Sequence, residues 1–234
     1  MYTYAYNITN TKEAAGSKNN YQSYVPFSTS DTLVYTSGAG ADEAPVFPAS
    51  IEWEHQFKYA IQVPNNQPPG TYSGTITYKM NDGATTLTRT CNISVTVGNY
   101  FRLSVDRGTV DFGGMKPGET KDNVPVEGAI VTSITNTGNP WYLKISNDSP
   151  LSSGPYTIPN TNFIWYGWTD GAGTWYGTGT NQMTFVPDLV YASGANEGNN
   201  LPKGTNNHLK FKLTIPRGQP GGKYLSNVKL TLTE

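Results

Sequence analysis

The residues best suited to bind a ligand are aromatic and lie together in one glycine-rich segment, residues 163–177. This segment carries three of the five tryptophans, separated by glycines and small polar residues. Flat amphipathic rings stack on sugar rings, and polar neighbours bind sugar hydroxyls. The candidate carbohydrate-binding residues are Trp165, Tyr166, Trp168, Asp170, Trp175 and Tyr176, with Asn162 as a further hydroxyl ligand. The alternative is that the tryptophans cap a β-sandwich core beneath a glycine-rich hairpin.

Oxygen-rich side chains occur in two loops, residues 40–43 and 196–200, which both follow a Ser-Gly-Ala sequence. Calcium takes six to eight convergent oxygens, and neither loop has a defined ligand spacing. A solvated loop is therefore favoured, with a calcium-stiffened loop as the alternative. One cysteine, Cys91, and two histidines are too few for a structural zinc site. We expect neither a metal nor another cofactor.

The acidic pair most suggestive of catalysis is Glu52 and Glu54, which lie two residues apart on an expected strand. Glycoside hydrolysis needs two carboxylates about 5 to 9.5 Å apart across a cleft, whereas these two share one strand face. Exposed edge charge that discourages aggregation explains them better. The chain has no nucleophile elbow, phosphate loop or metalloprotease motif. The sequence therefore predicts a protein that is not an enzyme.

The composition is typical of strands and turns. Charged residues make up 14% of the chain, while glycine, proline and tyrosine number 25, 16 and 16. This largely excludes a helical bundle, a coiled coil and a doubly wound α/β enzyme. The net charge of −1 argues against nucleic-acid binding. No apolar run approaches the roughly 18 residues of a membrane helix.

The first residues contain neither a basic region nor an apolar core, so we expect no secretion signal in this chain. Low charge combined with abundant threonine, asparagine and glycine is common in extracellular β proteins. We therefore expect an extracellular or cell-surface protein from which a signal has been removed.

Two parts of the chain resemble each other in sequence. The matching blocks are residues 33–39 with 189–195, 57–64 with 209–216, 67–72 with 219–224, and 75–80 with 227–232. The length differences fall in loops and the apolar positions stay in phase, as expected of an internal repeat. The alternative is convergence between two stretches of threonine- and glycine-rich strands.

Each copy is expected to form a strand, a turn and a second strand. Residues 57–63 and 209–215 alternate apolar side chains with a period of two, and Pro64 and Pro216 end them. In the first copy, Asn81-Asp82-Gly83 predicts a hairpin into a further strand at 86–97. The second copy reaches Glu234 without such a strand. Its leader is expected to contain strands at 101–105, 129–134 and 141–145.

These elements predict two tandem domains that meet near Gly98-Asn99. Residues 1–98 form the shorter one, and residues 99–234 form the longer one with the aromatic loop at 160–180. Four motifs carry a resemblance: Val-Asp-Phe-Gly at 110–113, Lys-Pro-Gly-Glu at 116–119, Thr-Asn-Thr-Gly-Asn-Pro-Trp at 135–141, and the segment 215–224. The chain resembles bacterial immunoglobulin-like domains of adhesins, pilus-type subunits and other cell-envelope proteins.

The resemblance extends over residues 101–234 and partly over 31–98, and Gly221 stands one residue later than in the most regular form. It implies an all-β chain with two tandem immunoglobulin-like β-sandwich domains related by the internal repeat. It also implies a location at the cell surface.

A sandwich that lacks a strand has an open edge, where a strand from another chain can pair. The N-terminal segment is a candidate donor, because Tyr2, Tyr4, Tyr6 and Ile8 alternate on one face. The alternative is that this segment pairs inside its own domain.

The sequence therefore predicts a non-enzymatic extracellular structural protein, a subunit of a surface layer, filament or adhesive appendage. The alternative is a carbohydrate-binding surface module that uses residues 163–177, and a third option is an accessory module of a larger secreted enzyme. The expected partners are further copies of the chain, other cell-surface proteins or a polysaccharide.

Overall fold

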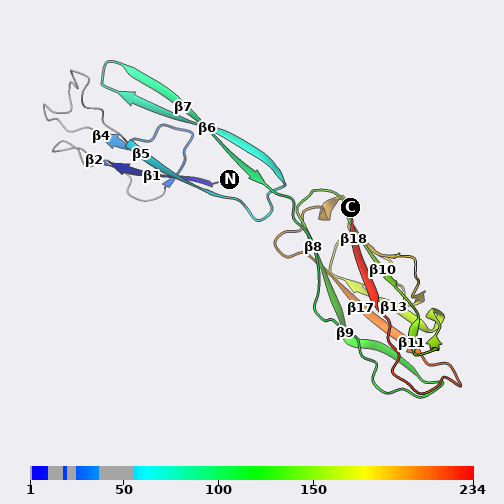
Figure 1. Cartoon of the computed structure of the whole chain (residues 1–234). Helices are drawn as coiled ribbons and strands as arrows, with labels where there is room; N and C mark the ends of the chain where they lie inside the picture. Colours follow the sequence, from blue (N-terminus) through cyan, green and yellow to red (C-terminus); the bar gives the residue numbers. More distant parts are fainter. Residues whose placement is uncertain (1, 10–17, 20–24, 37–54) are drawn as a thin grey trace. The chain divides into compact units, whose positions relative to one another are not determined.

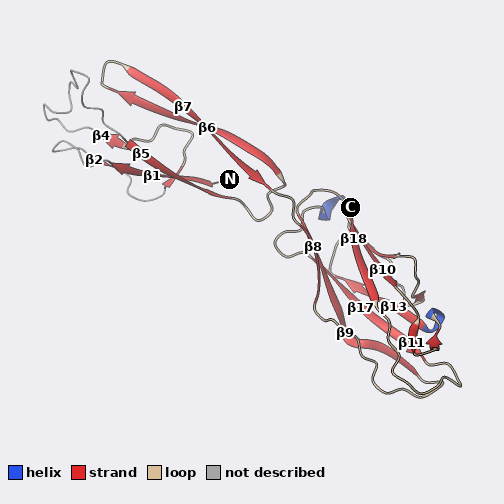
Figure 2. Cartoon of the chain, in the orientation of Figure 1, coloured by secondary structure: helices blue, strands red, loops and turns tan. Residues whose placement is uncertain are grey.

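A computed structural model describes the chain apart from residues 1, 10–17, 20–24 and 37–54 (Figure 1). The backbone divides into two compact units, Met1–Pro64 and Asn65–Glu234. In the described residues the ordered segments are antiparallel strands and two short 3-10 turns (Figure 2). The predicted all-β class is confirmed.

The first unit contains short sheets around one long strand pair. Its strands are β1 (Tyr2–Thr9), β2 (Lys18–Asn19), β3 (Val25–Pro26), β4 (Tyr35–Thr36) and β5 (His55–Gln62). β1 lies between β3 and β5, and β2 pairs with β4. β1 pairs with β5 along its whole length, from Tyr2 opposite Gln62 to Thr9 opposite His55.

The pairing of β1 bears on the predicted donor strand. The backbone of Tyr2, Tyr4, Tyr6 and Ile8 is paired with β5 of the same chain. A role between subunits would require β1 to leave β5, and it stays a prediction.

The second unit begins with a long hairpin of β6 (Gly70–Asn81) and β7 (Thr86–Val97). The two strands pair from Gly70 opposite Val97 to Asn81 opposite Thr86. The Asp82 carboxylate accepts the backbone N–H groups of Ala84 at 2.9 Å and Thr85 at 2.6 Å, which closes the turn. The hairpin therefore forms where the Asn-Asp-Gly sequence predicts it.

A five-stranded sheet follows, in the order β15-β13-β17-β9-β8. Its strands are β8 (Phe101–Val105), β9 (Thr120–Thr135), β13 (Phe163–Thr169), β15 (Asn181–Gln182) and β17 (Thr205–Thr214). The predicted strand at 129–134 is the second half of β9, which begins nine residues earlier and changes register against β17 on the way.

A four-stranded sheet has the order β14-β16-β10-β18. Its strands are β10 (Tyr142–Asn147), β14 (Thr174–Trp175), β16 (Asp188–Ala192) and β18 (Val228–Thr233). The remaining elements are the hairpin β11 (Leu151–Ser153) with β12 (Tyr156–Ile158), and the 3-10 turns η1 (Asn160–Asn162) and η2 (Ala195–Glu197).

The two larger sheets bury one common core and so form a sandwich (Figure 1). β17 alternates strictly, with Leu209, Phe211 and Leu213 buried and the intervening side chains half-buried. Leu143 and Ile145 of β10 belong to the same core from the other sheet. The period of two that predicted these strands therefore also separates the core side from the outer side of the sheet.

The connection between β7 and β8 is held by one buried amide. Asn136 is 3% exposed; its Oδ1 accepts the backbone N–H of Tyr100 at 2.7 Å, and its Nδ2 donates to the carbonyl of Gly98 at 3.1 Å. The boundary predicted near Gly98-Asn99 falls at this connection, whereas the two compact units divide after Pro64. The domain boundary stays a prediction.

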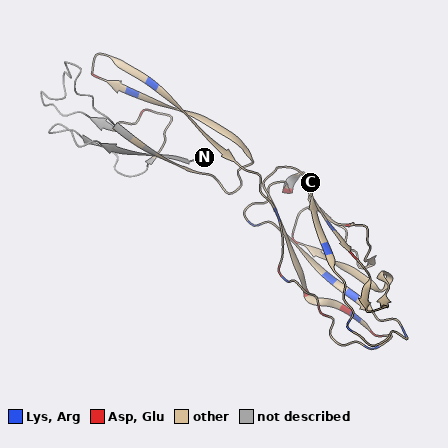
Figure 3. Ribbon diagram, in the orientation of Figure 1, with Lys and Arg blue, Asp and Glu red and all other residues tan. Residues whose placement is uncertain are grey.

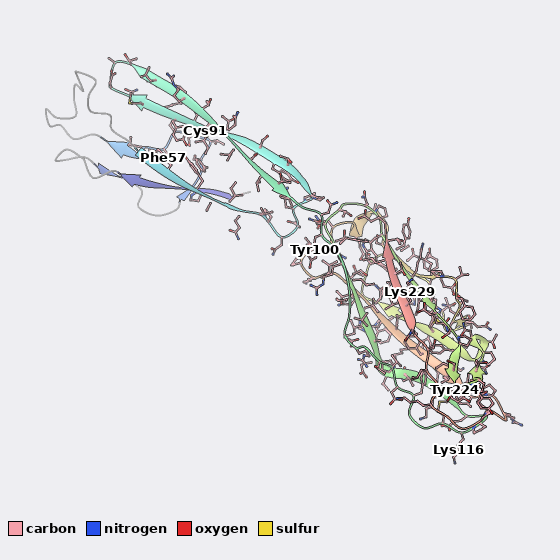
Figure 4. All side chains as sticks on the ribbon, in the orientation of Figure 1. Phe57, Cys91, Tyr100, Lys116, Tyr224 and Lys229 are labelled. Carbon is pink, nitrogen blue, oxygen red and sulfur yellow. The ribbon has the colours of Figure 1, made fainter. Side chains whose placement is uncertain are left out.

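Two tyrosines in segments of similar sequence make the same local contact. The Tyr72 hydroxyl donates to the carbonyl of Pro68 at 2.9 Å. The hydroxyl of Tyr224, which is labelled in Figure 4, donates to the carbonyl of Pro220 at 2.8 Å. In both places the acceptor lies four residues upstream in a Gln-Pro segment. The two segments therefore share this contact, and the internal repeat stays a prediction.

Candidate functional site

The alternation of β13 separates the aromatic residues that the sequence grouped as one binding loop. Trp165 is 1% exposed and belongs to the core with Phe163. Its ring therefore has no free face for a ligand. Tyr166 and Trp168 point to the outer side of the five-stranded sheet, which makes them the accessible part of this strand.

Trp175 and two glycines of the aromatic segment pack against neighbouring residues of the sandwich. Trp175 is half-buried against the core, and its Nε1 donates to the carbonyl of Gly177 at 2.9 Å. A Cβ at Gly171 would collide with the Tyr191 hydroxyl, and one at Gly173 would collide with the carbonyl of Ala192. These glycines are therefore required for close packing.

Of the remaining candidates, Asp170 lies on the same side of the five-stranded sheet as Trp168, whereas Tyr176 and Asn162 lie elsewhere. Tyr176 is 42% exposed, but its backbone N–H pairs with Val190 of the four-stranded sheet. The Asp170 carboxylate accepts the backbone and side-chain N–H groups of Asn206, at 2.7 and 3.0 Å. Asn162 precedes β13 and Asp170 follows it, so the two lie at opposite ends of the strand.

The accessible aromatic group is a stacked pair across β13 and β17. Trp168 lies directly opposite His208 in the ladder, and the two rings stack with centroids 4.5 Å apart and planes 5° apart. The Lys210 ammonium lies 4.9 Å from the centre of the Trp168 ring, within the range of a cation–π interaction. Trp168 is nevertheless 41% exposed.

Charged and polar side chains of β9, β13 and β17 lie on the same side of the sheet as this pair and bond to one another. The Tyr166 hydroxyl donates to Asp122 at 2.6 Å, and the Lys212 ammonium lies 3.8 Å from the other oxygen of Asp122. Lys210 also donates to the side-chain oxygen of Asn123. We call this group the Trp168 face; it consists of Asp122, Asn123, Tyr166, Trp168, His208, Lys210 and Lys212.

The hydrogen bond between Tyr166 and Asp122 shifts the pKa values of both groups. Burial, reinforced by donation to Asp122, raises the pKa of Tyr166 to about 12. The Tyr166 hydroxyl is the main cause that holds the pKa of the Asp122 carboxyl below its usual range. A lowered carboxyl pKa stabilises the fold above the unfolded value of about 4, and this contribution is lost as the pH falls through the folded pKa.

We therefore expect Tyr166→Phe to lower the free energy of unfolding by about 1 kcal/mol at pH 7, because a hydrogen bond to a partly exposed carboxylate is lost. The deficit should be smaller at pH 3, because the contribution of the lowered Asp122 pKa is fully present only above the unfolded value of about 4. Urea unfolding at the two pH values measures both quantities, with the exposed Tyr176→Phe as the control. An equal loss of unfolding free energy at pH 7 and pH 3 would show that the hydrogen bond to Asp122 does not account for the effect of the substitution.

Most of the Trp168 face was missed by reasoning from the sequence. His208, which stacks on Trp168, is the fourth residue of β17. The alternation of buried Leu209, Phe211 and Leu213 already places His208, Lys210 and Lys212 together on the opposite side. The bulge in β9 that brings Asp122 and Asn123 to the same surface has no comparable signal.

The loop at residues 196–200 is closed by internal hydrogen bonds. The Glu197 carboxylate accepts the Tyr191 hydroxyl and the backbone N–H of Ala172, and Asn200 Oδ1 accepts the backbone N–H of Thr135 at 2.8 Å. These oxygens brace the fold, so the solvated-loop interpretation is wrong for Glu197 and Asn200. Residues 40–43, Glu52 and Glu54 lie outside the described residues.

The second candidate feature is the edge of the four-stranded sheet at β18. Within the described part of the chain, β18 pairs with β10 and has no strand on its other side. Leu230 and Leu232 are only partly buried against the core. Partly buried apolar residues also occur between β8 and β9, at Val110, Phe112 and Met115.

The direction of the backbone groups on β18 follows from its pairing with β10. Asp148 N–H donates to the carbonyl of Asn227 at 3.2 Å, so alternate residues of β18 from Lys229 onward face β10 in an antiparallel ladder. The N–H and C=O groups of Leu230 and Leu232 consequently point to the unpaired edge. Such an edge is a template for a further strand.

Among the described residues there is no helix with the length and hydrophobicity to cross a membrane. Comparisons with protein-family models, curated proteins and solved structures found no match. The functional assignment therefore rests on the Trp168 face and the β18 edge.

Proposed function

We propose that the protein is a non-enzymatic extracellular structural protein whose sandwich domains are immunoglobulin-like. The strand order supports this arrangement. If β8, β9, β10, β13, β17 and β18 are taken as strands A to F, one sheet has the order A-B-E-D and the other contains the pair C-F. In an immunoglobulin domain strand G lies beside F, which is the position of the open edge of β18.

The sequence similarity between the two predicted repeats also supports immunoglobulin-like domains. Tyr72 and Tyr224 both form the contact of a tyrosine corner, in which the hydroxyl bonds to backbone a few residues upstream. In the repeat β6 corresponds to β18, and β6 is paired along its length with β7. By this correspondence β7 occupies the G position, which is empty beside β18 in the described residues.

The function proposed is that of a subunit in a surface layer, filament or adhesive appendage, assembled by pairing at the edge of β18. The observation that carries it is the exposed row of backbone groups at Leu230 and Leu232. Pairing of one edge with a different segment of the next copy is heterologous and can propagate into a filament. The segment that pairs there is a strand of another copy of this chain or of another surface protein.

We expect the purified chain to elute as species larger than its monomer mass of 25.5 kDa. Thr231→Lys with Thr233→Lys should return it to the monomer, because charges on an edge strand oppose further pairing. Both threonines lie on the outer side of β18, away from the core side occupied by Leu230 and Leu232. Size exclusion with light scattering gives the mass, and negative-stain microscopy shows whether the assemblies are regular.

Thr178→Lys with Thr180→Lys is the matched control, because it adds the same charge in the exposed loop between β14 and β15. Its assembly should equal that of the unmodified chain. If the edge variant and the control assemble alike, association does not use β18.

A second candidate function is binding to carbohydrate, and one observation favours it. Trp168 keeps 41% of its surface exposed while its ring is fixed by stacking on His208. A fixed, exposed indole flanked by hydrogen-bonding groups suits stacking on a sugar ring. In this proposal the Trp168 face replaces the whole segment 163–177 as the binding site.

A further inference from the structure

A second long strand with an open edge is β7. In the described part of the chain β7 pairs with β6 alone. The backbone N–H of Asp82 donates to the carbonyl of Thr85 at 3.2 Å, and these two residues continue the register of the hairpin. Bonded pairs alternate along an antiparallel ladder, so the odd-numbered residues of β7 face β6. The even-numbered residues, from Thr86 to Thr96, therefore point their N–H and C=O groups to the open edge.

The two sides of β7 differ in polarity. From Cys91 to Val97 the odd-numbered residues are apolar, while the even-numbered ones are asparagine, serine and threonine. Ile93, Val95 and Val97 are only half-buried, so the apolar side is incompletely covered. β7 contains no proline, and Arg89 is its one charged residue (Figure 3). This strand therefore lacks the charges and prolines that usually keep an open edge from pairing.

The polarity of the two open edges determines how they can pair. In an antiparallel pair, residues that bond to each other lie directly opposite, with side chains on the same side of the sheet. Antiparallel pairing would set Leu230 and Leu232 of β18 against the polar side chains of β7. In a parallel pair, each residue bonds to the two residues that flank the one opposite. Parallel pairing therefore sets both leucines against apolar residues of β7.

One parallel register keeps all six residues of β18 opposite residues of β7 and keeps Arg89 away from the core side. On the core side its opposite pairs are Val228 with Cys91, Leu230 with Ile93, and Leu232 with Val95. On the outer side they are Lys229 with Asn92, Thr231 with Ser94, and Thr233 with Thr96. Apolar residues then meet apolar ones, polar residues meet polar ones, and no like charges lie opposite each other.

We propose that β7 of one copy of the chain pairs in parallel with β18 of the next copy. The inference rests on the proposed function and names the strand that occupies the edge of β18. The four-stranded sheet then continues from β18 into β7 and β6 of the neighbour. Each chain brings one edge of each kind, so the contact is heterologous and propagates. β1, the donor expected from the sequence, already has β3 and β5 on its two sides.

Disulfide cross-linking of the full chain tests both the partner and the register. Val228→Cys places a thiol opposite Cys91 of the neighbouring copy, and both positions are exposed (Figure 4 labels Cys91). Neighbouring strands lie about 4.8 Å apart, which a disulfide can span. With oxidised glutathione as the oxidant, we expect a ladder of linked chains on a non-reducing gel, because each chain carries both thiols. Adding Cys91→Ser to this variant should abolish the ladder.

Thr178→Cys is the matched control, because it adds a thiol in the exposed loop between β14 and β15. Val228→Cys should cross-link about tenfold faster than this control, since paired strands hold the two thiols at a high effective concentration. Circular dichroism establishes that each variant is folded, and light scattering gives its mass before oxidation.

The outcomes separate the partner strand from assembly itself. Linked dimers that persist after Cys91→Ser would show that β18 pairs with a second β18; this overturns the inference and leaves assembly at β18 standing. Equal rates for Val228→Cys and Thr178→Cys in an assembled sample would also overturn the pairing of β7 with β18. A chain that stays monomeric at every concentration would overturn the proposed function, and the inference with it.

Discussion

Gly167→Ala is expected to destabilise the C-terminal sandwich by more than about 3 kcal/mol, or to prevent its folding. A Cβ at this position would overlap the carbonyl oxygen of His208 and lie 2.9 Å from its carbonyl carbon. Those atoms belong to β17, the central strand of the five-stranded sheet, and cannot move without breaking its pairing with β13. The φ of +151° adds strain for any residue with a side chain.

Gly179→Ala separates steric overlap from backbone strain. Gly179 has a φ of +92°, but a Cβ there would meet nothing within 4 Å. Its cost should stay within about 1–3 kcal/mol. Urea unfolding followed by far-ultraviolet circular dichroism compares the two variants. Equal costs would mean that β13 and β17 do not approach each other as closely as described.

Trp141→Ala has the second largest expected effect, a loss of about 3–5 kcal/mol. Trp141 is fully buried just before β10, where its ring packs 5.2 Å from that of Tyr191. Its Nε1 donates to the carbonyl of Glu197 at 3.0 Å, so the substitution also leaves that carbonyl without this partner. The melting temperature should fall by about 10 °C for a unit of this size.

The neighbouring residue supplies the control for Trp141. Tyr142 is exposed on the outer side of β10, so Tyr142→Ala should change the free energy of unfolding by about 0.5 kcal/mol or less. A Trp141→Ala variant as stable as Tyr142→Ala would place Trp141 outside the core.

The strands were predictable because their alternation is regular and their turns contain proline and glycine. The expected strand at 101–105 matches β8, and that at 86–97 matches β7. The alternation in residues 209–215 also separates core from surface, which is why β17 follows the sequence closely. The pattern at residues 129–134 predicted only the second half of β9. The first half of β9 changes register against β17, and its side chains do not alternate regularly.

The candidate site was harder to predict because it joins residues that are distant in the sequence. The sequence grouped Trp165 and Trp168 as neighbours, whereas strand geometry places them on opposite sides of a sheet. Conversely, His208 reaches Trp168 only through the register of β13 against β17. The glycines suggested an open loop, but only glycine fits at positions 171 and 173, because Tyr191 and Ala192 fill the space around them.

The measurement that tests assembly at β18 most directly is amide hydrogen exchange of this strand at low and high protein concentration. At low concentration, Leu230 and Leu232 should exchange quickly, while Thr231, which faces β10, stays protected. At high concentration, Leu230 and Leu232 should become protected in step with the increase in mass. If the mass rises while both amides still exchange quickly, assembly occurs elsewhere and the proposed role of the β18 edge is contradicted.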